Sequence, residues 1–135
     1  MNTMKAIPLS EVSGVKFGMK RCDVRKIFGE ATEFKKSKFS KTTTDDFGFC
    51  HVFYNLNNEC EAIEIFDEIE VQINDTSVFP NDMDKLKSML PDIEEDSCGF
   101  ISKSKSIGVY APYGKMESIL FGCKGYYDWQ IRAAP

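Results

Sequence analysis

The sequence predicts an α+β fold with a mainly antiparallel sheet of about five to seven strands and two short α-helices. Runs rich in β-branched and aromatic residues recur along the chain, and only two segments show helical periodicity. The strands also lack the strict strand–helix alternation of a parallel sheet. With 135 residues, 42% hydrophobic and 13% aromatic, the chain is expected to form a single globular domain over residues 1–135.

The first helix is predicted over residues 20–28. Val24, Ile27 and Phe28 recur at helical spacing, so they define one apolar stripe. Gly29 follows the last of them, and glycine at that position is a frequent helix stop. The remaining positions include several Lys and Arg residues, which predicts a basic outer surface for this helix.

A lysine-rich edge strand and a hairpin are predicted after this helix. Residues 31–39 alternate weakly, and their lysines would protect a sheet edge from aggregation. Residues 42–46 are polar and are expected to form a turn. The strongest hairpin signal joins residues 49–56 to residues 60–66 through a short connection that contains two asparagines.

The second half of the chain is predicted to add a helix and more strands. Residues 69–73 alternate strictly between apolar and polar side chains, which is typical of a half-buried antiparallel strand. Residues 82–90 carry one apolar stripe and precede a proline, so they predict the second helix. After a turn over residues 92–99, further strands are predicted over residues 100–103, 107–111 and 115–123.

Charge is segregated along the chain. Residues 42–100 contain fifteen Asp and Glu against two Lys, whereas residues 15–41 contain nine Lys and Arg against three acids. The formal net charge of −4 therefore conceals two oppositely charged segments, which predicts that a partner is met electrostatically. The basic segment is interleaved with Phe17, Phe34 and Phe39, but the overall pI of 5.1 argues against direct nucleic-acid binding.

Patterns typical of catalytic, metal or cofactor sites are not found in the sequence. His51 is the only histidine, and the adjacent Cys50 points to the opposite face of the same strand. Glu61 and Glu64 are likewise expected on opposite faces, so they do not predict a working carboxylate pair. The five cysteines have no paired spacing and are interpreted as free, buried or semi-buried thiols. No catalytic residue, metal or cofactor is predicted, and the chain is not expected to be an enzyme.

The chain is expected to be cytoplasmic, with no membrane partner. Its first residues have too few apolar side chains for a secretory signal. Nothing in the sequence approaches the roughly 20 consecutive apolar residues of a membrane span.

Several short motifs together support a resemblance to a known family. They are GVKFGM at residues 14–19, VRKIFG at 24–29, TTDDFG at 43–48, EAIEIF at 61–66, and ISK followed by SIGVYAP between 101 and 112. With these motifs the chain resembles, from about residue 14 to residue 127, immunity proteins of bacterial contact-dependent growth inhibition and related polymorphic toxin systems.

The resemblance implies a protein that binds and neutralises the C-terminal domain of a cognate toxin. Many such toxins are nucleases with basic clefts, and clustered carboxylates are suited to occupy a basic cleft. Under this hypothesis, the expected toxin-contacting acids are Asp45, Asp46, Glu59, Glu61, Glu94, Glu95 and Asp96. The expected aromatic anchors are Tyr54, Tyr110 and Tyr113, because aromatic residues are enriched among interface hot spots.

Two alternatives stay open from the sequence. The first is a small-molecule-binding domain or an enzyme of unknown activity, with a pocket between the sheet and the helices. The second is a homo-oligomeric scaffold protein, in which the basic segment of one copy meets the acidic segment of another. Such a contact, for example in a homodimer, is also compatible with an immunity function.

Overall fold

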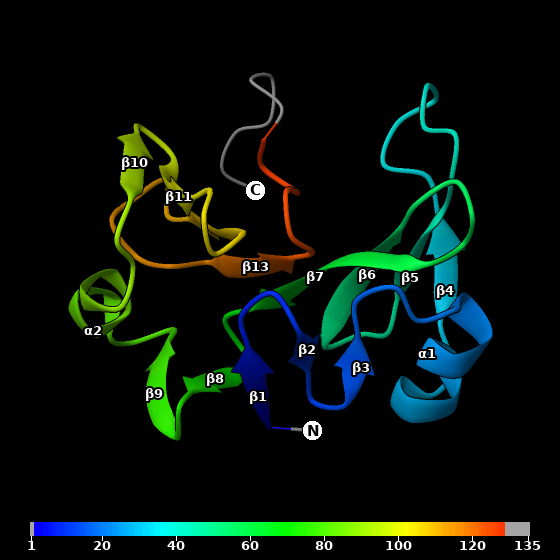
Figure 1. The fold of residues 1–135 in the computed structure, drawn as a ribbon, viewed down its shortest axis with the longest axis horizontal. Coiled ribbons are helices and arrows are strands. Elements are labelled where there is room, and N and C mark those ends of the chain that lie inside the picture. Colours follow the sequence, from blue (N-terminus) through cyan, green and yellow to red (C-terminus); the bar gives the residue numbers. More distant parts are fainter. Residues whose placement is uncertain (1, 129–135) are drawn as a thin grey trace.

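The structure is a computed structural model that describes residues 2–128, and these residues form thirteen strands and two helices (Figure 1). The helices are α1 (Arg21–Phe28) and α2 (Met83–Ser88). The strands of the N-terminal half are β1 (Thr3–Ile7), β2 (Glu11–Val12), β3 (Val15–Lys16), β4 (Thr32–Phe34), β5 (Thr44–Asp46), β6 (Cys50–Tyr54) and β7 (Cys60–Phe66). Those of the C-terminal half are β8 (Glu70–Ile73), β9 (Thr76–Phe79), β10 (Ile93–Asp96), β11 (Gly99–Ser102), β12 (Ile107–Tyr110) and β13 (Ser118–Gly122).

The strands divide into two sheets. One has five strands in the order β3-β2-β1-β8-β9, and the other has eight strands in the order β10-β11-β12-β13-β7-β6-β5-β4. All pairings between named strands are antiparallel except that of β1 with β8, which is parallel. The mainly antiparallel α+β class with two short helices is confirmed, but the predicted count of five to seven strands in one sheet was wrong.

The main core lies between the two sheets. The five-stranded sheet contributes buried residues such as Met4, Val71 and Phe79, and the eight-stranded sheet contributes others such as Ile63 and Ile119 to the same cluster. This arrangement explains the short apolar runs of the sequence, because each strand needs to bury only one of its faces in this core. A second, smaller cluster lies on the other face of the eight-stranded sheet and consists of Phe53, Ala62, Ile101, Leu120 and Tyr127.

The two helices lie at opposite sides of the molecule (Figure 1). Helix α1 buries Val24 and Phe28 in the main core and ends at Gly29, whose φ of 98° suits glycine, as the sequence predicted. Helix α2 buries Leu86, and the Asp82 side chain caps its start by accepting a hydrogen bond of 3.0 Å from the Lys85 amide. Within residues 2–128, neither helix has the length and apolar character required to cross a bilayer.

The predicted hairpin is present as β6 and β7, but it contains an irregularity. Phe53 pairs with Ala62, whereas the next residue, Tyr54, pairs with Cys60, so Glu61 has no partner of its own in the ladder. This bulge interrupts the alternation on which the predicted separation of Glu61 from Glu64 relied. Cys60 joins the main core cluster and Ala62 joins the smaller cluster.

Two predicted turns are strands instead. Residues 44–46 form β5, which lies inside the eight-stranded sheet between β4 and β6, and residues 93–96 form β10, an edge strand of the same sheet. An edge strand is confirmed here, because β4 is the opposite edge of this sheet. It spans only Thr32–Phe34 and contains no lysine, so the prediction that the strand itself is lysine-rich was wrong, and the lysines lie in the segment that follows it. The acidic residues of these segments misled the prediction, since strands seldom carry consecutive carboxylates.

The cysteines follow the prediction only in part. Cys22, Cys50, Cys60 and Cys98 are free thiols, and Cys50 and Cys60 are buried. Burial raises the pKa of the Cys60 thiol to about 12, so this thiol stays protonated at neutral pH. Cys22 and Cys98, however, are exposed, so the prediction that these two are buried was wrong.

Candidate acidic binding face

The register of the eight-stranded sheet gathers acidic and aromatic residues on one of its faces. Residues paired directly across neighbouring strands point to the same side of a sheet. One paired row runs through Glu94, Ile101, Gly108, Leu120, Glu64, His51 and Asp46, and the next runs through Asp96, Gly99, Tyr110, Ser118 and Phe66. We call the face that carries these two rows the outer face. The opposite, inner face carries the main core.

A hollow of about 620 Å³ opens on the outer face near the end of β7. It is lined by Glu64, Phe66, Asp67, Glu68, Tyr110, Glu117 and Ser118. Four of these seven residues are carboxylates, two carry aromatic rings, and none is a lysine or arginine. We call this site the acidic hollow, and its charge and rings suit a cationic guest.

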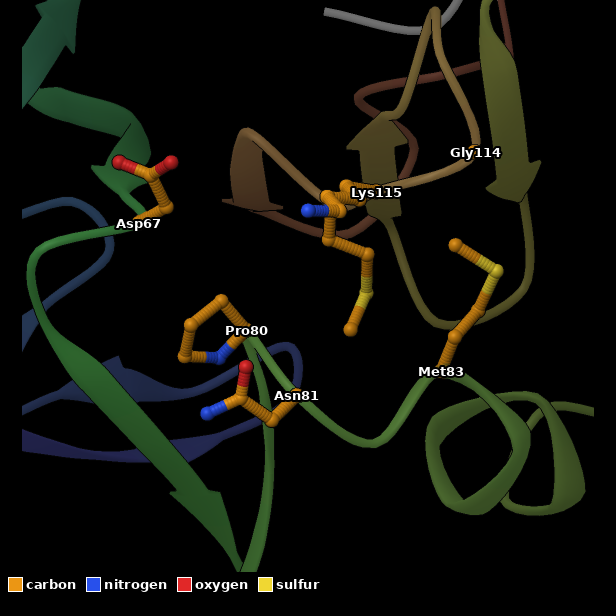
Figure 2. Close-up of a pocket in the computed structure, with 7 residues that line it drawn as sticks. Asp67, Pro80, Asn81, Met83, Gly114 and Lys115 are labelled. Atoms are coloured by element: carbon orange, nitrogen blue, oxygen red, sulfur yellow. The ribbon is translucent and has the colours of Figure 1, made fainter.

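A second pocket of about 410 Å³ adjoins the acidic hollow, because Asp67 lines both. Figure 2 shows it between the turn that follows β7, the segment that leads from β9 to α2, and the β12–β13 loop. Its lining residues are Asp67, Pro80, Asn81, Met83, Gly114, Lys115 and Met116. Lys115 places a positive charge in this second pocket, so the negative character is concentrated in the acidic hollow.

Polar contacts inside the acidic hollow do not form a nucleophilic catalytic arrangement. The Ser118 hydroxyl donates a hydrogen bond of 2.8 Å to the Glu64 carboxylate, whereas a catalytic serine donates to a general base such as an imidazole. His51 pairs with Glu64 in the ladder, but its Nε2 lies 3.6 Å from Asp46. Its ring contacts Phe34 and Phe66 edge-on, with centroid distances of 5.0 and 4.8 Å. Within residues 2–128, no group of His, Cys, Asp and Glu side chains is arranged to hold a metal ion.

Three of the acids predicted to contact a partner lie on the edge strand β10. Glu94, Glu95 and Asp96 are all exposed. The register places Glu94 and Asp96 on the outer face, where Lys103 approaches Glu94 at 3.7 Å. Glu95 points to the other side of the strand and forms an ion pair with Lys87 of α2. Of the two β10 acids on the outer face, Glu94 is therefore close to a lysine, whereas no ion pair is found for Asp96 among the described residues.

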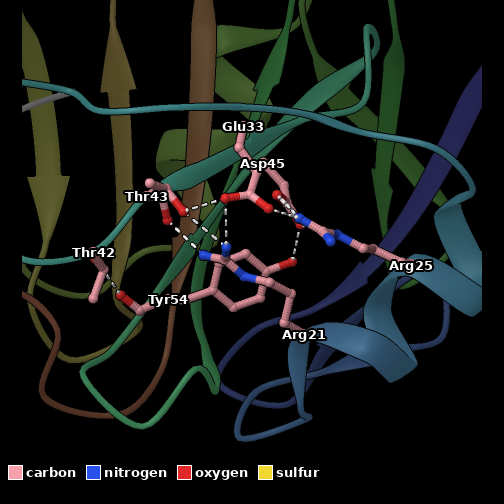
Figure 3. A network of polar contacts seen from close by, with 7 residues as sticks. All are labelled: Arg21, Arg25, Glu33, Thr42, Thr43, Asp45 and Tyr54. Atoms are coloured by element: carbon pink, nitrogen blue, oxygen red, sulfur yellow. Dashed lines mark hydrogen bonds and ion pairs between the residues drawn. The ribbon is translucent and has the colours of Figure 1, made fainter.

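Asp45 and Tyr54, in contrast, are buried and do not face solvent. The exposed fraction is 0% for Asp45 and 2% for Tyr54, so the expectation of an acidic surface loop at Asp45 and an exposed ring at Tyr54 was wrong. The reason is a polar network that joins α1 to β4, β5 and β6 (Figure 3). Arg21 and Arg25 are four residues apart, so both project from the same side of α1 toward these strands.

Asp45 lies at the centre of this network. Arg25 donates two hydrogen bonds to its carboxylate, of 2.9 and 2.7 Å, and the Tyr54 hydroxyl donates a third of 2.8 Å. Arg25 also bonds Glu33 at 2.8 Å, and Arg21 donates to the Thr43 hydroxyl and carbonyl. Its hydrogen bonds to Asp45 and then Glu33 raise the pKa of the Arg25 guanidinium, while burial and then Asp45 raise the pKa of the Tyr54 phenol. Apart from the buried Arg21 Nε, for which no hydrogen-bond partner is found among residues 2–128, these groups satisfy one another, so the network holds the fold together.

The other predicted contact residues occupy separate places. Asp46 and Tyr110 are partly exposed on the outer face, and Tyr113, 88% exposed, lies in the β12–β13 loop next to Gly114 of the second pocket. Glu59 forms an ion pair of 3.4 Å with Lys20, which engages its carboxylate near the start of α1. Glu61 lines a small pocket together with Lys36 and is not among the residues that line the acidic hollow. Only Tyr110 among the ten predicted residues therefore lines the acidic hollow.

Sequence reasoning missed most of the acidic hollow. Asp67, Glu68 and Glu117 were not singled out, and Glu64 was considered only as a partner for Glu61. The Glu64 and Ser118 side chains touch although 54 positions separate them. The pairing of β7 with β13 creates the site, and that pairing has no local sequence signal. The local signal that could have identified part of the site is the pair Asp67 and Glu68, which directly follows the predicted strand over residues 60–66.

Asp92 organises the segment that leads into β10, whose acids Glu94, Glu95 and Asp96 form the acidic edge of the sheet. Its carboxylate accepts hydrogen bonds of 2.5 and 2.9 Å from the Ser102 and Ser104 hydroxyls, and one of 2.9 Å from the Ser104 amide. Burial alone would raise the pKa of Asp92, but these hydrogen bonds outweigh it, and the pKa lies below the ordinary value of 3.8. These bonds hold the segment before β10 against the turn after β11.

This pKa shift predicts a specific acid sensitivity. Because the folded-state pKa is lowered, the stabilisation from Asp92 is complete above pH 3.8 and is lost as the pH falls through the lower folded value. We expect D92N to lower the free energy of unfolding by about 1 kcal/mol at neutral pH. Below pH 3.8, its urea-unfolding free energy should fall less steeply with pH than that of the wild type. Parallel curves for the two proteins would contradict the proposed role of this carboxylate.

Comparisons with known proteins give no relative whose site could be compared with this one. A scan against protein-family models returns no match, and neither do searches of curated proteins and of solved structures.

Proposed function

We propose that the chain is an immunity protein that binds and neutralises a cognate toxin domain, a basic nuclease or RNase, through the outer face. The observation that supports this most directly is the acidic hollow, where four carboxylates surround two aromatic rings without a neighbouring cation in the lining. A lysine or arginine of the toxin is the chemical group that fits such a site. The family resemblance of the sequence motifs agrees with this assignment.

The flanking surface extends the same chemistry toward β10. Gly99 stands between Asp96 and Tyr110 in its paired row, is not fully buried, and places no side chain over the sheet. A partner surface is therefore able to approach the backbone there while its basic groups meet acids on both sides. A nuclease cleft is positively charged because it binds phosphate, so occupation by these carboxylates would exclude the nucleic-acid substrate.

The test uses the terminal domain encoded by the neighbouring upstream reading frame as the partner. Coexpression with the wild-type chain should relieve the toxicity of that domain, and the purified proteins should form a complex. The double variant E68K/E117K reverses two charges of the acidic hollow. At low salt we expect its association rate constant to be lower than that of the wild type by at least about tenfold, because charged interfaces steer diffusional encounter.

The matched control is E30K, which makes the same kind of charge change at an exposed residue beyond α1. It should associate at the wild-type rate, and the deficit of E68K/E117K should shrink as salt screens exposed charges. Complex formation that is equally fast for all three proteins would remove the acidic hollow from the interface. Failure of the wild-type chain to bind or neutralise the domain would overturn the proposed function itself.

A further inference from the structure

The segment that joins β4 to β5 forms a protruding loop with an ordered tip. The Ser40 amide donates a hydrogen bond of 3.1 Å to the Ser37 carbonyl, which closes a β-turn with Lys38 and Phe39 at its two corners. The Phe39 amide also donates to the Ser37 hydroxyl at 3.2 Å. In Figure 1 this cyan loop extends away from the sheets at the upper right of the molecule.

The loop exposes an aromatic ring among lysines. The Phe39 side chain is 80% exposed, and the Lys38 ammonium lies 5.2 Å from the centre of its ring. Residues 35–43 contain no acid, and their basic residues are Lys35, Lys36, Lys38 and Lys41, all exposed. We call residues 35–41 the lysine loop. Within the part of the chain that the structure describes, none of its ammonium groups forms an ion pair with a carboxylate.

One of these lysines is directed back to the protein. The Lys36 ammonium lies 4.2 Å from the centre of the Phe53 ring and shares a small pocket with Glu61. It therefore anchors the base of the loop on the sheet. Lys35, Lys38 and Lys41 remain as the outward charges beside Phe39.

The lysine loop is remote from the acidic edge of the molecule. Strands β4 and β10 are the two opposite edges of the eight-stranded sheet, so seven strand spacings separate them. At about 4.8 Å per spacing this amounts to roughly 30 Å along the sheet. A Debye length of about 8 Å at physiological salt screens the acids of β10 from the lysine loop. The acids of β10 thus do not cancel the local positive field of the loop.

We propose that the lysine loop is a peripheral membrane-binding element that docks on an anionic phospholipid surface. Phe39 would enter the interfacial layer, and Lys35, Lys38 and Lys41 would contact lipid phosphates. An exposed aromatic residue beside lysines is suited to such an interface, because the ring leaves water while the ammonium groups stay at headgroup level. The expectation that the chain has no membrane partner rested on the lack of a membrane-spanning segment in the sequence. Peripheral binding of this kind needs no such segment.

The shape of the loop favours a membrane over a nucleic acid. Binders of single strands track the phosphate backbone along a groove and stack successive bases on several rings. The lysine loop instead presents a single exposed ring on a narrow, convex tip, which suits a deformable surface. Docking through this loop leaves the acidic edge at β10 free, so the inference is independent of the proposed toxin binding.

The test is cosedimentation of the full chain with lipid vesicles at low and physiological salt. We expect binding to vesicles of phosphatidylcholine with phosphatidylglycerol and none to vesicles of phosphatidylcholine alone. K38Q should weaken binding about fivefold, and K35Q/K38Q/K41Q about a hundredfold, because each lysine near an anionic surface contributes a similar free energy. F39S should weaken binding about tenfold, because it removes an apolar ring from the interface. The matched controls are K5Q and L56S, which change an exposed lysine and a 72% exposed leucine outside the loop.

A spectroscopic measurement tests insertion of the ring directly. In F39W/W129F, the only tryptophan is at position 39, and its emission should shift to the blue when anionic vesicles are added. Inorganic phosphate should not produce this shift, which separates a lipid surface from binding of free phosphate.

Four outcomes would overturn the proposal. They are absence of binding to anionic vesicles, equal binding of the loop variants and the wild type, equal losses in the two control variants, and an unchanged emission of Trp at position 39. Salt-sensitive binding of the loop to single-stranded RNA without vesicle binding would assign it to nucleic acid, and self-association lost in K35Q/K38Q/K41Q without vesicle binding would assign it to a second copy.

Discussion

Replacing Asp45 with alanine is expected to lower the free energy of unfolding by about 3–5 kcal/mol, because it removes one partner of a buried ion pair. Asp45 is fully buried and accepts three hydrogen bonds, two from Arg25 and one from Tyr54. In D45A the Arg25 guanidinium keeps only Glu33, and the buried Tyr54 hydroxyl loses its acceptor. Urea denaturation monitored by circular dichroism measures this loss.

A matched variant separates burial from charge. D46A removes the neighbouring carboxylate, which is partly exposed and accepts a hydrogen bond of 2.8 Å from the Gly48 amide. D46A should lower the free energy of unfolding by about 1 kcal/mol. Y54F removes only the hydroxyl that reaches Asp45 and should cost about 1–2 kcal/mol, which keeps the test informative if D45A does not fold. Equal unfolding midpoints for D45A and D46A would show that the network does not stabilise the fold.

The same network explains why part of the chain resisted prediction. The threonines and aspartates of residues 42–46 are typical of a turn, yet Asp45 is buried because Arg25 reaches it from α1. The helix itself was predictable, since periodicity and the glycine stop are local signals. The sequence also contained a hint of the network, because Arg21 and Arg25 are spaced to project together beside Val24 and Phe28. Which carboxylate they would meet depends on the packing of α1 on the sheet.

Pairings between distant strands account for the other differences. The hairpin of β6 and β7 was predictable because its two strands are joined by a short connection. The parallel pairing of β1 with β8 and the division into two sheets depend on contacts between segments far apart in sequence. The acidic hollow depends on the same kind of contact, since β13 must lie beside β7 before Ser118 meets Glu64. Net charge predicted a negative surface, but only the register determined which acids share a face.

Replacing Gly99 with alanine is expected to lower the free energy of unfolding by about 3–5 kcal/mol, because backbone strain and a steric clash add together. Gly99 has a φ of 147°, and a Cβ atom there would lie 1.9 Å from the Val109 carbonyl oxygen. That oxygen belongs to the backbone of β12, so it can move only if β11 separates from its neighbour. The displacement would carry β10 with it, because Asp96 pairs with Gly99.

The appropriate control is G48A, which combines a positive φ of 88° with open space around the added methyl group. It should cost only about 1–2 kcal/mol, the strain of a left-handed conformation in a residue with a side chain. Thermal and urea unfolding of the two variants measure the difference, and equal losses would show that the clash with Val109 is relieved without separating the strands. Because Glu94 and Asp96 move with β10, G99A should also slow association with a basic partner at temperatures where it stays folded, whereas G48A should not. Stability and binding would then be lost together at one glycine, which ties the acidic edge to the β11–β12 pairing that holds it in place.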